Sequence, residues 1–581
     1  MTQNAVVADL LEEMAARLEA MDVDYKPRAY RRAAENIRGH PADVAGLAAE
    51  GEAAVREIKG VGDAIAAKVV EYVEAGEIGE LEELRAELPA DIEVLTRIEG
   101  VGPKTVGDLY RELGVETLDD LEAAAEAGEI REVKGFGPKT EENIRDGIAF
   151  ARESHGRELL GEGRPLADRV INHLEATGVV KRAEAAGSLR RWKPTIGDVD
   201  VLVASEAPEP VFDAFTGWEG TDRVIEAGEA KASVRAEGLR VDLRVVTPGA
   251  FGAALQYFTG SRDHNVQVRN RAIDRGLTMN EYGVFDVSDL DDEAREDAGP
   301  RAGERVAGES ERGMYAAVDL PWLPPELRED RGEVDAAAAG DLPDLLEQPD
   351  VRGDLHLHTD QSDGNDTVAE MAEAAAAFGH EYIAVTDHAT GPGMVGGVGL
   401  DDEALREQVD EVREVDADVA VFTGVEANID ADGGLSVADD VLDDLDCVVA
   451  SPHAGLDGDG TDRLVAAIEH PATDIVGHPT GRRLNQRSGL DVDLETVGKA
   501  AAEHGVALEV NANPRRLDLE GGAVKLVVEQ GATVAINTDA HRPESYAYMR
   551  YGVHTARRGW AEPADVLNTQ PAGGIRQFLG I

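Results

Sequence analysis

The chain has 581 residues, of which 116 are acidic and 57 are lysine or arginine, so its formal net charge is -59. This length exceeds what one hydrophobic core organises, which predicts several domains. No stretch approaches the ~20 apolar residues of a membrane span, and no charged-then-apolar leader opens the chain, so we expect no membrane association. Cys447 is the single cysteine, which excludes a disulfide framework and favours a cytoplasmic protein.

The acid excess disfavours a nucleic-acid partner at first sight, because one polyanion repels another. The excess is spread along the whole chain, however, and few of the basic residues are lysine. That pattern is typical of proteins that work in molar salt, where the Debye length falls to ~3 Å and long-range repulsion vanishes. We therefore expect a halophilic source. Composition alone leaves open an ordinary acidic protein without a nucleic-acid role.

Residues 1–155 carry Ala, Glu and Leu at helical spacing, broken by short glycine-rich turns. We expect two helical regions, 1–85 and 86–155. Three turns repeat one Gly-x-Gly pattern, and each lies between two helical stretches, as in a helix-hairpin-helix, where phosphate approaches backbone N–H groups at a helix N-terminus. A single such turn is most often an ordinary helix cap, whereas three favour a grip on the DNA backbone. The six glycines expected to bind DNA are Gly60, Gly62, Gly100, Gly102, Gly135 and Gly137.

Residues 156–260 change to strand alternation and carry two aspartates, Asp198 and Asp200, on Gly-Asp-Val-Asp-Val-Leu-Val. Side chains at i and i+2 of a strand share a face, so this pair can hold metal ions roughly 3.5–4 Å apart, as in two-metal phosphoryl chemistry. The same Asp-Val-Asp tripeptide recurs at 22–24 and 491–493, where we interpret it as solvated surface. The pair at 198–200 differs by its neighbours: a Gly187-Ser188-Leu-Arg-Arg turn suited to phosphate precedes it, and Asp242 follows on a later strand.

Farther along, the segment 257–265 reads Tyr-Phe-Thr-Gly-Ser-Arg-Asp-His-Asn. Together with Gly-Ser-x-Arg-Arg, Asp-Val-Asp and Arg-Val-Asp (240–242), it makes residues 1–330 resemble the family X DNA polymerases, such as DNA polymerase beta, and still more their bacterial and archaeal relatives. The resemblance implies a nucleotidyltransferase palm at 156–260, a thumb at 261–330, and Mg²⁺ or Mn²⁺ in the polymerase site.

The resemblance also implies roles for single residues. Asp198 and Asp200 would bind both metals, and Asp242 would bind the catalytic metal and help the primer 3′-hydroxyl lose its proton. The residues expected to hold the nucleotide are Gly187, Ser188 and Arg191 at the triphosphate, Tyr257, Phe258 and Gly260 at the sugar, and Asn265 and Arg269 at the nucleotide and template minor groove. Core aromatics and a surface charge are the alternatives for Tyr257-Phe258 and Arg269. Trp192 stands where DNA polymerase beta has glycine. The turn after Arg191 can therefore differ in shape from the corresponding turn of DNA polymerase beta.

Lys68 in the first hairpin aligns with the lysine that forms a Schiff base at abasic sites in DNA polymerase beta, and Lys26 and Tyr30 also match that pocket. A nucleophilic lysine needs a depressed pKa. Ala64 replaces another lysine of that pattern, which weakens a lyase interpretation of Lys68. An exposed helix lysine is the alternative.

After an Ala/Gly/Asp-rich stretch expected to be a linker (331–350), short apolar strands alternate with helices over 351–581, which indicates a βα-repeat domain. Ten of the 14 histidines lie there. Polar groups at the carboxyl ends of successive strands converge on one rim of a barrel. Seven strands are expected to end near His356/His358, His388, Glu426, His453, His478, Asn511 and Asp539/His541. Four other histidines are interpreted as structural, namely His380, His470, His504 and His554.

Segments such as Gly-Asp-Leu-His-Leu-His-Thr (353–359), Thr-Asp-His (386–388) and Asn-Thr-Asp-Ala-His (537–541) resemble the PHP (polymerase and histidinol phosphatase) family. The resemblance implies a distorted (β/α)7 barrel with up to three ions. Its nine ligand positions are His356, His358, Asp363, His388, Glu426, His453, His478, Asp539 and His541. Mixed imidazole and carboxylate ligands suit Mn²⁺, Zn²⁺ or Fe²⁺ better than Mg²⁺ alone, and such ions activate water against a phosphodiester. Arg482 and Arg515/Arg516 are candidates for gripping the phosphate, and a surface role is the alternative for the latter pair.

Together these patterns predict a multidomain α+β and α/β protein: a helix-hairpin-helix region, a palm with thumb, and the barrel. The function expected is gap-filling DNA synthesis in base excision repair, with a 3′-5′ exonuclease, DNA-end or abasic-site phosphodiesterase in the barrel. Expected partners are gapped or primer-template DNA and dNTPs, and other repair proteins are further candidates. Alternatives are a barrel that is structural or acts on a small phosphoester such as histidinol phosphate, a non-catalytic DNA scaffold, and a tRNA-tailing or antibiotic-modifying nucleotidyltransferase.

Overall fold

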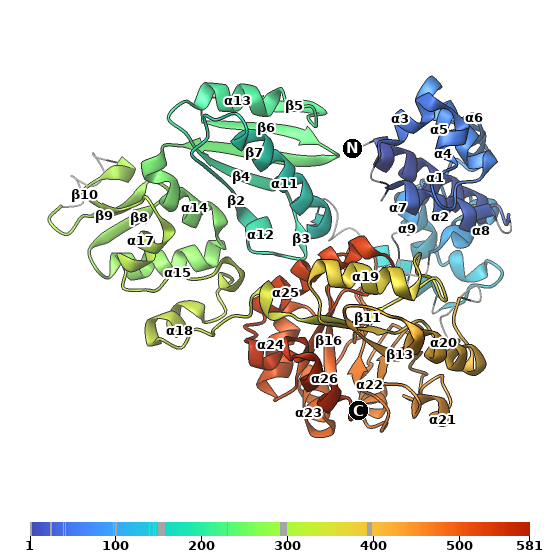
Figure 1. The fold of residues 1–581 in the computed structure, drawn as a ribbon. Helices are drawn as coiled ribbons and strands as arrows, with labels where there is room; N and C mark the ends of the chain where they lie inside the picture. Colours follow the sequence, from blue (N-terminus) through green and yellow to red (C-terminus); the bar gives the residue numbers. More distant parts are fainter. Residues whose placement is uncertain are drawn as a thin grey trace. The chain divides into compact units, whose positions relative to one another are not determined.

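The computed structural model describes residues 3–23, 26–38, 40, 42–96, 98, 101–138, 140–142, 144, 145, 147, 148, 157–228, 230–290, 299–391 and 398–581. The chain forms two compact units (Figure 1). The first comprises Met1–Gly156 with Asn485–Ser488, and the second comprises Arg157–Leu484 with Gly489–Ile581. Among the described residues, no helix is long and apolar enough to cross a membrane.

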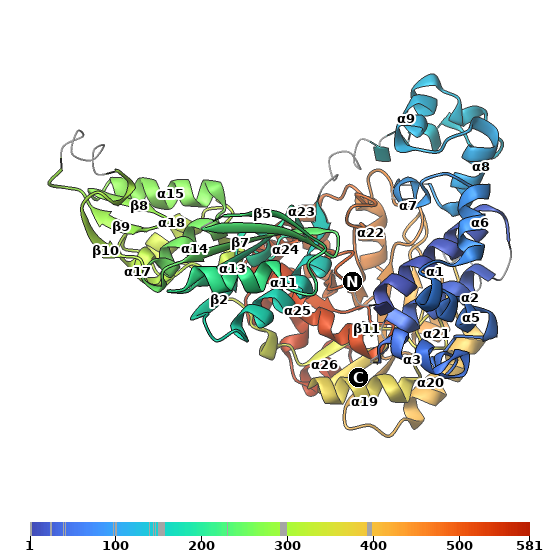
Figure 2. The same ribbon diagram turned by 90° about the horizontal axis from the view of Figure 1, so that it is seen from above.

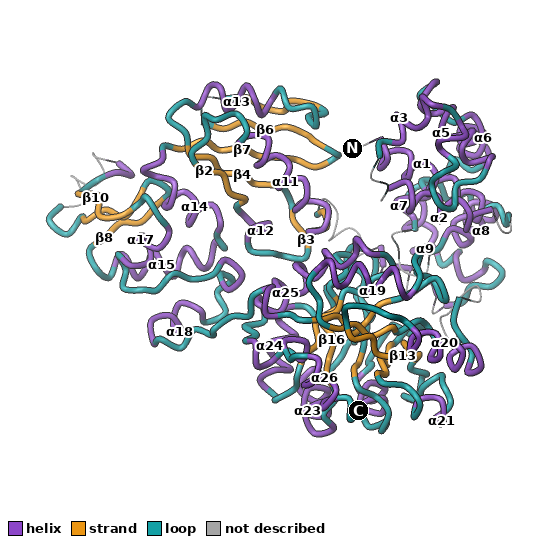
Figure 3. Tube along the Cα trace, in the orientation of Figure 1, coloured by secondary structure: helices purple, strands orange, loops and turns teal. Residues whose placement is uncertain are grey.

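The described part of residues 1–156 is helical, as predicted (Figure 3). Gly62 and Gly102 are the N-cap residues of two of its helices, and Thr117 caps a third through a reciprocal bond with Asp120. Buried Leu, Ile, Val and Ala side chains form two cores. The helices are α1 (Gln3–Ala20), α2 (Lys26–Arg38), α3 (Val44–Glu50), α4 (Glu52–Val55), α5 (Asp63–Ala75), α6 (Gly79–Glu87), α7 (Ile92–Leu95), α8 (Pro103–Leu113), α9 (Leu118–Ala127) and η1 (Ile130–Glu132).

The expected palm is a five-stranded sheet in the order β2-β4-β7-β6-β5. Alternate residues of its strand β4 face opposite sides: Val201 and Val203 pack with helices α11 and α13, whereas Leu202 packs with α14. Asp200, two residues before Leu202, therefore points to the face of the sheet that α14 covers. The elements are β1 (Glu158–Leu159), α11 (Leu160–Glu175), β2 (Arg182–Ala185), α12 (Gly187–Arg190), β3 (Thr195–Ile196), β4 (Val199–Ala204), α13 (Pro208–Thr216), β5 (Arg223–Ala227), β6 (Lys231–Ala236), β7 (Leu239–Val246), η2 (Pro248–Ala250) and α14 (Phe251–Thr259).

In the expected thumb, two helices lie beside a small antiparallel sheet, and both views show this arrangement (Figures 1 and 2). Residues 331–350, expected to be a linker, contain a helix whose Glu333 is fully buried and bonded to His264 of the thumb. The elements are α15 (Arg262–Ile273), β8 (Leu277–Asn280), β9 (Gly283–Asp286), η3 (Gly299–Arg301), β10 (Glu304–Ala307), α17 (Glu311–Ala316), η4 (Pro325–Leu327), α18 (Glu333–Ala339) and η5 (Gln348–Asp350).

The remaining residues form the predicted seven-stranded parallel barrel, with strands in chain order from β11 to β17. A bridge between Leu357 and Ala540 joins the two ends of the sheet. The strands are β11 (Gly353–Leu357), β12 (Tyr382–Val385), β13 (Ala420–Asn428), β14 (Cys447–Ser451), β15 (Ile475–Val476), β16 (Ala507–Asn511) and β17 (Val534–Asn537). The helices are α19 (Val368–Phe378), α20 (Asp402–Glu414), α21 (Asp439–Leu442), α22 (Thr461–Ile468), α23 (Leu494–His504), α24 (Gly521–Glu529), η6 (Pro543–Tyr548), α25 (Met549–Arg558), η7 (Pro563–Asp565), η8 (Leu567–Thr569) and α26 (Ala572–Phe578).

Two candidate metal centres

The palm brings three carboxylates together. Strands β4 and β7 are parallel neighbours, and their register places Asp200 directly opposite Asp242. Ligand oxygens of Asp198, Asp200 and Asp242 all lie within 4.8 Å of one another. Burial, followed by repulsion from the other two carboxylates, raises the pKa of Asp200 to about 7. A divalent cation relieves such repulsion, so the donor set fits the metal pair that two-metal phosphoryl transfer needs.

Asp242 is the most buried of the three and is already held by cations. Arg240 donates to it at 2.9 Å, and the Lys231 ammonium lies 3.2 Å away. Burial raises the pKa of Asp242, but the hydrogen bond from Arg240 and the nearby Lys231 ammonium outweigh burial, so its pKa is lowered overall. This carboxylate is therefore ionised and fixed in place.

The phosphate cradle is built onto the strand that carries Asp200. The Ala186 N–H donates to the Asp200 carbonyl at 2.8 Å, and helix α12 starts at the next residue. Gly187 has φ +61°, and a Cβ there would stand 2.3 Å from the Asp200 carboxylate. Only glycine fits that position, because any other side chain would strike the aspartate. Ser188, the other predicted cradle residue, follows on the first turn of α12.

The two arginines that close the predicted cradle are each held by a carboxylate, which is buried for Arg190 and half-buried for Arg191. Arg190 donates to Glu311 at 2.7 Å and 2.8 Å. Arg191 donates from Nε to Glu329 at 2.9 Å and from Nη1 to the Thr259 carbonyl. The guanidinium predicted to hold the triphosphate is thus oriented by acceptors from two other elements.

The predicted sugar contacts lie at the end of α14. Tyr257 is 42% exposed, and its ring meets that of Phe258 edge-on at 5.1 Å. Asn265 on α15 donates to the Tyr257 carbonyl at 2.8 Å. A Cβ on Gly260 would stand 3.0 Å from the Arg191 guanidinium, so this turn directly adjoins the cradle. Arg269 is exposed farther along α15.

The helix-hairpin-helix glycines present open backbone. Of the six, Gly60, Gly62, Gly102 and Gly135 are exposed, Gly137 is half-buried, and Gly100 lies outside the described residues. Space over Gly62, Gly102, Gly135 and Gly137 is clear to 4 Å. Because Gly62 and Gly102 cap helices α5 and α8, this space lies at helix N-termini, where phosphate binds readily.

Lys68 stands in surroundings that oppose the chemistry of a Schiff-base lysine. Its ammonium lies 2.8 Å from Glu80 and 6.0 Å from the centre of the Tyr30 ring. Burial lowers the pKa of Lys68, but the hydrogen bond to Glu80 and the attraction of Tyr30 outweigh burial, so its pKa is raised. A nucleophilic amine needs the opposite shift. The lyase role of Lys68 stays a prediction.

Borohydride trapping on abasic DNA tests Lys68. We expect the native chain to give little trapped adduct and Glu80→Gln to give several-fold more, since the partner that keeps Lys68 protonated is lost. Lys68→Ala should give none. Equal trapping by the native and Lys68→Ala chains would contradict a lyase role for this residue.

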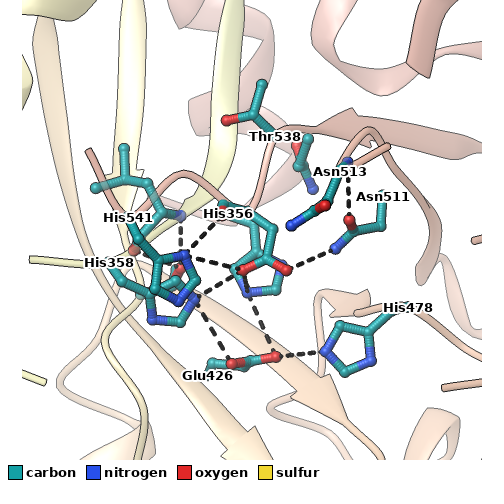
Figure 4. A network of polar contacts seen from close by, with 12 residues as sticks. His356, His358, Glu426, His478, Asn511, Asn513, Thr538 and His541 are labelled. Carbon is teal, nitrogen blue, oxygen red and sulfur yellow. Dashed lines mark hydrogen bonds and ion pairs between the residues drawn. The ribbon is translucent and has the colours of Figure 1, made fainter. Parts of the chain in front are cut away.

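Histidine and carboxylate side chains that could hold metal ions crowd the carboxyl-end rim of the barrel (Figure 4). Glu426 lies at the centre, with the His478 ring 2.9 Å from one carboxylate oxygen and the His388 ring 2.6 Å from the other. Three clusters have ligand atoms within 4.8 Å of one another, and they share His358 and His388. The clusters are His358/Asp363/His388/His541, His356/His358/Asp539 and His388/Glu426/His453.

Unpartnered ring nitrogens show that these clusters fit metal ions. Among the described residues, buried His356 Nε2, both nitrogens of His358 and His453 Nε2 make no hydrogen bond. A buried polar atom without a partner is costly, and a metal ion supplies the missing bond. The other nitrogens are fixed: His356 Nδ1 lies 2.7 Å from Glu509, and His453 Nδ1 lies 2.8 Å from Asn428. Such outer partners set the tautomer and aim the free nitrogen at the metal.

Glu509 and Asn428, which hold the histidines, were not among the site residues predicted from the sequence. Glu509 is fully buried on β16 and also accepts a hydrogen bond from the backbone N–H of His478 at 2.7 Å. Its signal was available, because it stands two residues before the strand-end Asn511 and so shares its face. Arg482, a candidate phosphate grip, instead donates to the carbonyls of Arg516 and Leu517 and braces that loop. Arg516 does reach the site, with its guanidinium 3.6 Å from Asp539.

Comparison with known proteins decides the family. The chain is 35% identical over 580 residues to the DNA polymerase/3′-5′ exonuclease PolX of Bacillus subtilis (strain 168), covering 98% of both chains. The chain belongs to the PolX family. It is an enzyme, a nucleotidyltransferase of the DNA polymerase kind joined to a metal-dependent phosphoesterase domain. Family models match at 2–78 (helix-hairpin-helix domain), 92–149 (SAM-like helix-hairpin-helix tandem), 254–329 (DNA polymerase beta thumb) and 354–513 (PHP domain).

Two further relatives match part of this chain. DNA polymerase lambda of Rattus norvegicus is 26% identical over 294 residues, 47% of this chain and 48% of its own. A probable phosphatase of Thermoanaerobacter sp. (strain X514) is 30% identical over 244 residues, 39% of this chain and 93% of its own.

Proposed function

We propose that this PolX-family enzyme fills short gaps during DNA repair at the palm and trims DNA 3′ ends at the barrel. The observation that carries the first part is the Asp198/Asp200/Asp242 cluster beside a triphosphate cradle anchored on the same strand. The second part is carried by the buried ring nitrogens left without partners on the barrel rim. The 3′-5′ exonuclease named in the Bacillus subtilis relative supports it.

At the palm, this chain's residues position the reactants. Ser188 and Arg191 hold the triphosphate, while Tyr257, Phe258 and Gly260 form the wall against its sugar. Asp198, Asp200 and Asp242 would hold two divalent ions, Mg²⁺ or Mn²⁺, which supply Lewis-acid stabilisation of the developing charge when bound. Asp242 is the carboxylate that helps the primer 3′-hydroxyl lose its proton.

At the barrel, the nine predicted ligands would hold Mn²⁺, Zn²⁺ or Fe²⁺, which supply a nucleophilic hydroxide when bound. Glu509 and Asn428 keep His356 and His453 in the tautomers that face the ions. Arg516, beside Asp539, is the cation placed to meet the phosphodiester.

One assay tests both halves: gapped DNA with a 5′-labelled primer, dNTPs and Mn²⁺. We expect extension of the primer with dNTPs present and its stepwise shortening without them. Primer that is neither extended nor shortened would refute the proposal.

A small phosphoester is the second candidate for the barrel, favoured by its 30% identity to a probable phosphatase. Comparing hydrolysis of histidinol phosphate with that of a labelled oligonucleotide by the same preparation decides between the two. Faster turnover of histidinol phosphate would replace the nuclease proposal for the barrel.

We also propose that the enzyme works in high salt, on the strength of the -59 net charge. Raising KCl from about 0.1 M to about 1 M shortens the Debye length from ~10 Å to ~3 Å and removes most repulsion between carboxylates. The melting temperature should therefore rise by several degrees over this range. A melting temperature that stayed level or fell would contradict a halophilic source.

A further inference from the structure

The cradle ends in a residue whose backbone is strained. Trp192 follows Arg191 and has φ +54°, the left-handed region that bulky side chains rarely adopt. Such a conformation persists only where the surroundings hold it. The Trp192 ring stacks on the His554 ring of the barrel helix α25, with ring centres 3.6 Å apart and planes 8° apart. The Arg164 guanidinium also lies 5.0 Å from the centre of the Trp192 ring.

A second bond from α25 reaches the cradle arginine itself. Arg558, which is 5% exposed, donates from Nη1 to the Arg191 carbonyl at 2.6 Å and to the Glu329 carboxylate at 3.1 Å. The same Glu329 oxygen accepts from Arg191 Nε. Glu329 is therefore shared between the arginine predicted to hold the triphosphate and an arginine of the barrel.

Further contacts make α25 a fixed support. His554 Nδ1 lies 2.6 Å and Arg557 Nε lies 2.8 Å from one oxygen of Glu326. Glu326 stands shortly before Glu329, the carboxylate that accepts from Arg191. Burial raises the pKa of Glu326, but His554 and Arg557 outweigh burial and lower it to about 2. One turn earlier, Arg550 donates to Asp168 of the palm at 3.3 Å. Positions 550, 554 and 557 share one helix face, so the whole face is committed to the palm and thumb.

Apolar side chains also pack between the palm and the barrel. Leu517 and Tyr551 of the barrel belong to the hydrophobic core of the palm. A Cβ on Gly161 of the palm would stand 2.5 Å from Pro514 of the barrel. This close approach leaves little room for α25 to shift while the cradle keeps its shape.

We propose that helix α25 of the PHP barrel positions the triphosphate cradle of the polymerase, with His554 holding Trp192 and Arg558 holding Arg191. These are positioning residues for nucleotide binding at a site that lies in another domain. The inference rests on the proposed role of the cradle. It makes nucleotide affinity depend on a barrel helix that carries none of the nine predicted metal ligands.

Single-turnover incorporation of dTTP opposite template A on gapped DNA gives the test, since it separates the dTTP dissociation constant from the rate of the step. His554→Gln keeps a donor for Glu326 but lacks the ring, and it should raise the dissociation constant about tenfold. His554→Phe keeps a ring to stack and should stay within about threefold of the native chain. Exposed His504 on α23 provides the matched control, and His504→Ala should change nothing.

A double-mutant cycle isolates the contact. Glycine adopts a φ of +54° without strain and has no ring to be held. The dTTP dissociation constants of Trp192→Gly and of the double variant Trp192→Gly/His554→Gln should therefore differ by less than about twofold. This expectation holds whatever the effect of Trp192→Gly alone. Equal effects of His554→Gln with tryptophan or glycine at position 192 would overturn the inference, as would native affinity in His554→Gln.

Arg191→Ala separates this inference from the proposed function. If that variant binds dTTP weakly while His554→Gln binds normally, the cradle stands and its support by the barrel is wrong. If Arg191→Ala binds dTTP as the native chain does, the proposed cradle itself fails, and the inference falls with it. Exonuclease activity with Mn²⁺ and the melting temperature should match the native values in His554→Gln, which shows that the barrel is intact.

Discussion

Asp242→Ala should abolish incorporation of dNTPs while leaving the protein folded. Asp242 is opposite Asp200 across two parallel strands, and its loss removes one of three carboxylates that would hold the metal ions. Loss of several kcal/mol of transition-state stabilisation lowers the rate at least about 10³-fold. Primer extension on gapped DNA under single-turnover conditions measures the change.

An aspartate outside the palm supplies a control for Asp242. Asp491, in the Asp-Val-Asp at 491–493, is exposed, and Asp491→Ala should extend primers at the native rate. Asp242→Asn separates charge from shape, because it keeps the side chain's size beside Lys231 and Arg240. Substantial synthesis by Asp242→Asn would refute the assignment of this carboxylate.

The barrel was predictable because its signal is repeated. The expected ligands other than Asp363 lie at or near the carboxyl end of an apolar strand, and parallel strands end on one rim, so the chain order of His356, His388, His453 and Asp539 already implied their convergence. Glu509 was missed because it stands inside an apolar run, Ala-Leu-Glu-Val-Asn, although its spacing from Asn511 places both side chains on one face of the strand.

The support of the cradle could not be predicted from the sequence. His554 was interpreted as a structural histidine, and nothing near it in the chain names Trp192 as its partner. Their stacking depends on how α25 meets the palm, which is a property of tertiary packing rather than of local pattern. Trp192 did signal an anomaly, because it departs from the glycine of DNA polymerase beta. Its positive φ explains why glycine suits that position.

The double variant His356→Ala/His358→Ala should remove Mn²⁺-dependent 3′-5′ degradation and spare synthesis. His358 belongs to two of the three ligand clusters, and His356 joins it in one of them. Three of the four ring nitrogens of this pair are buried and make no hydrogen bond among the described residues, so we expect the double variant to lose metal binding more than folding. We expect shortening of a 5′-labelled single strand to fall at least about 10³-fold.

The control and the metal content decide what the loss of degradation means. His504→Ala, on an exposed part of the same barrel, should degrade DNA at the native rate. Metal analysis of the purified double variant should show fewer bound ions than the native chain, while gap filling stays within about twofold. If degradation survived with the ions gone, the barrel would not be the nuclease. If synthesis fell with degradation while α25 stayed folded, the two sites would be coupled through the metal rim as well as through His554 and Arg558.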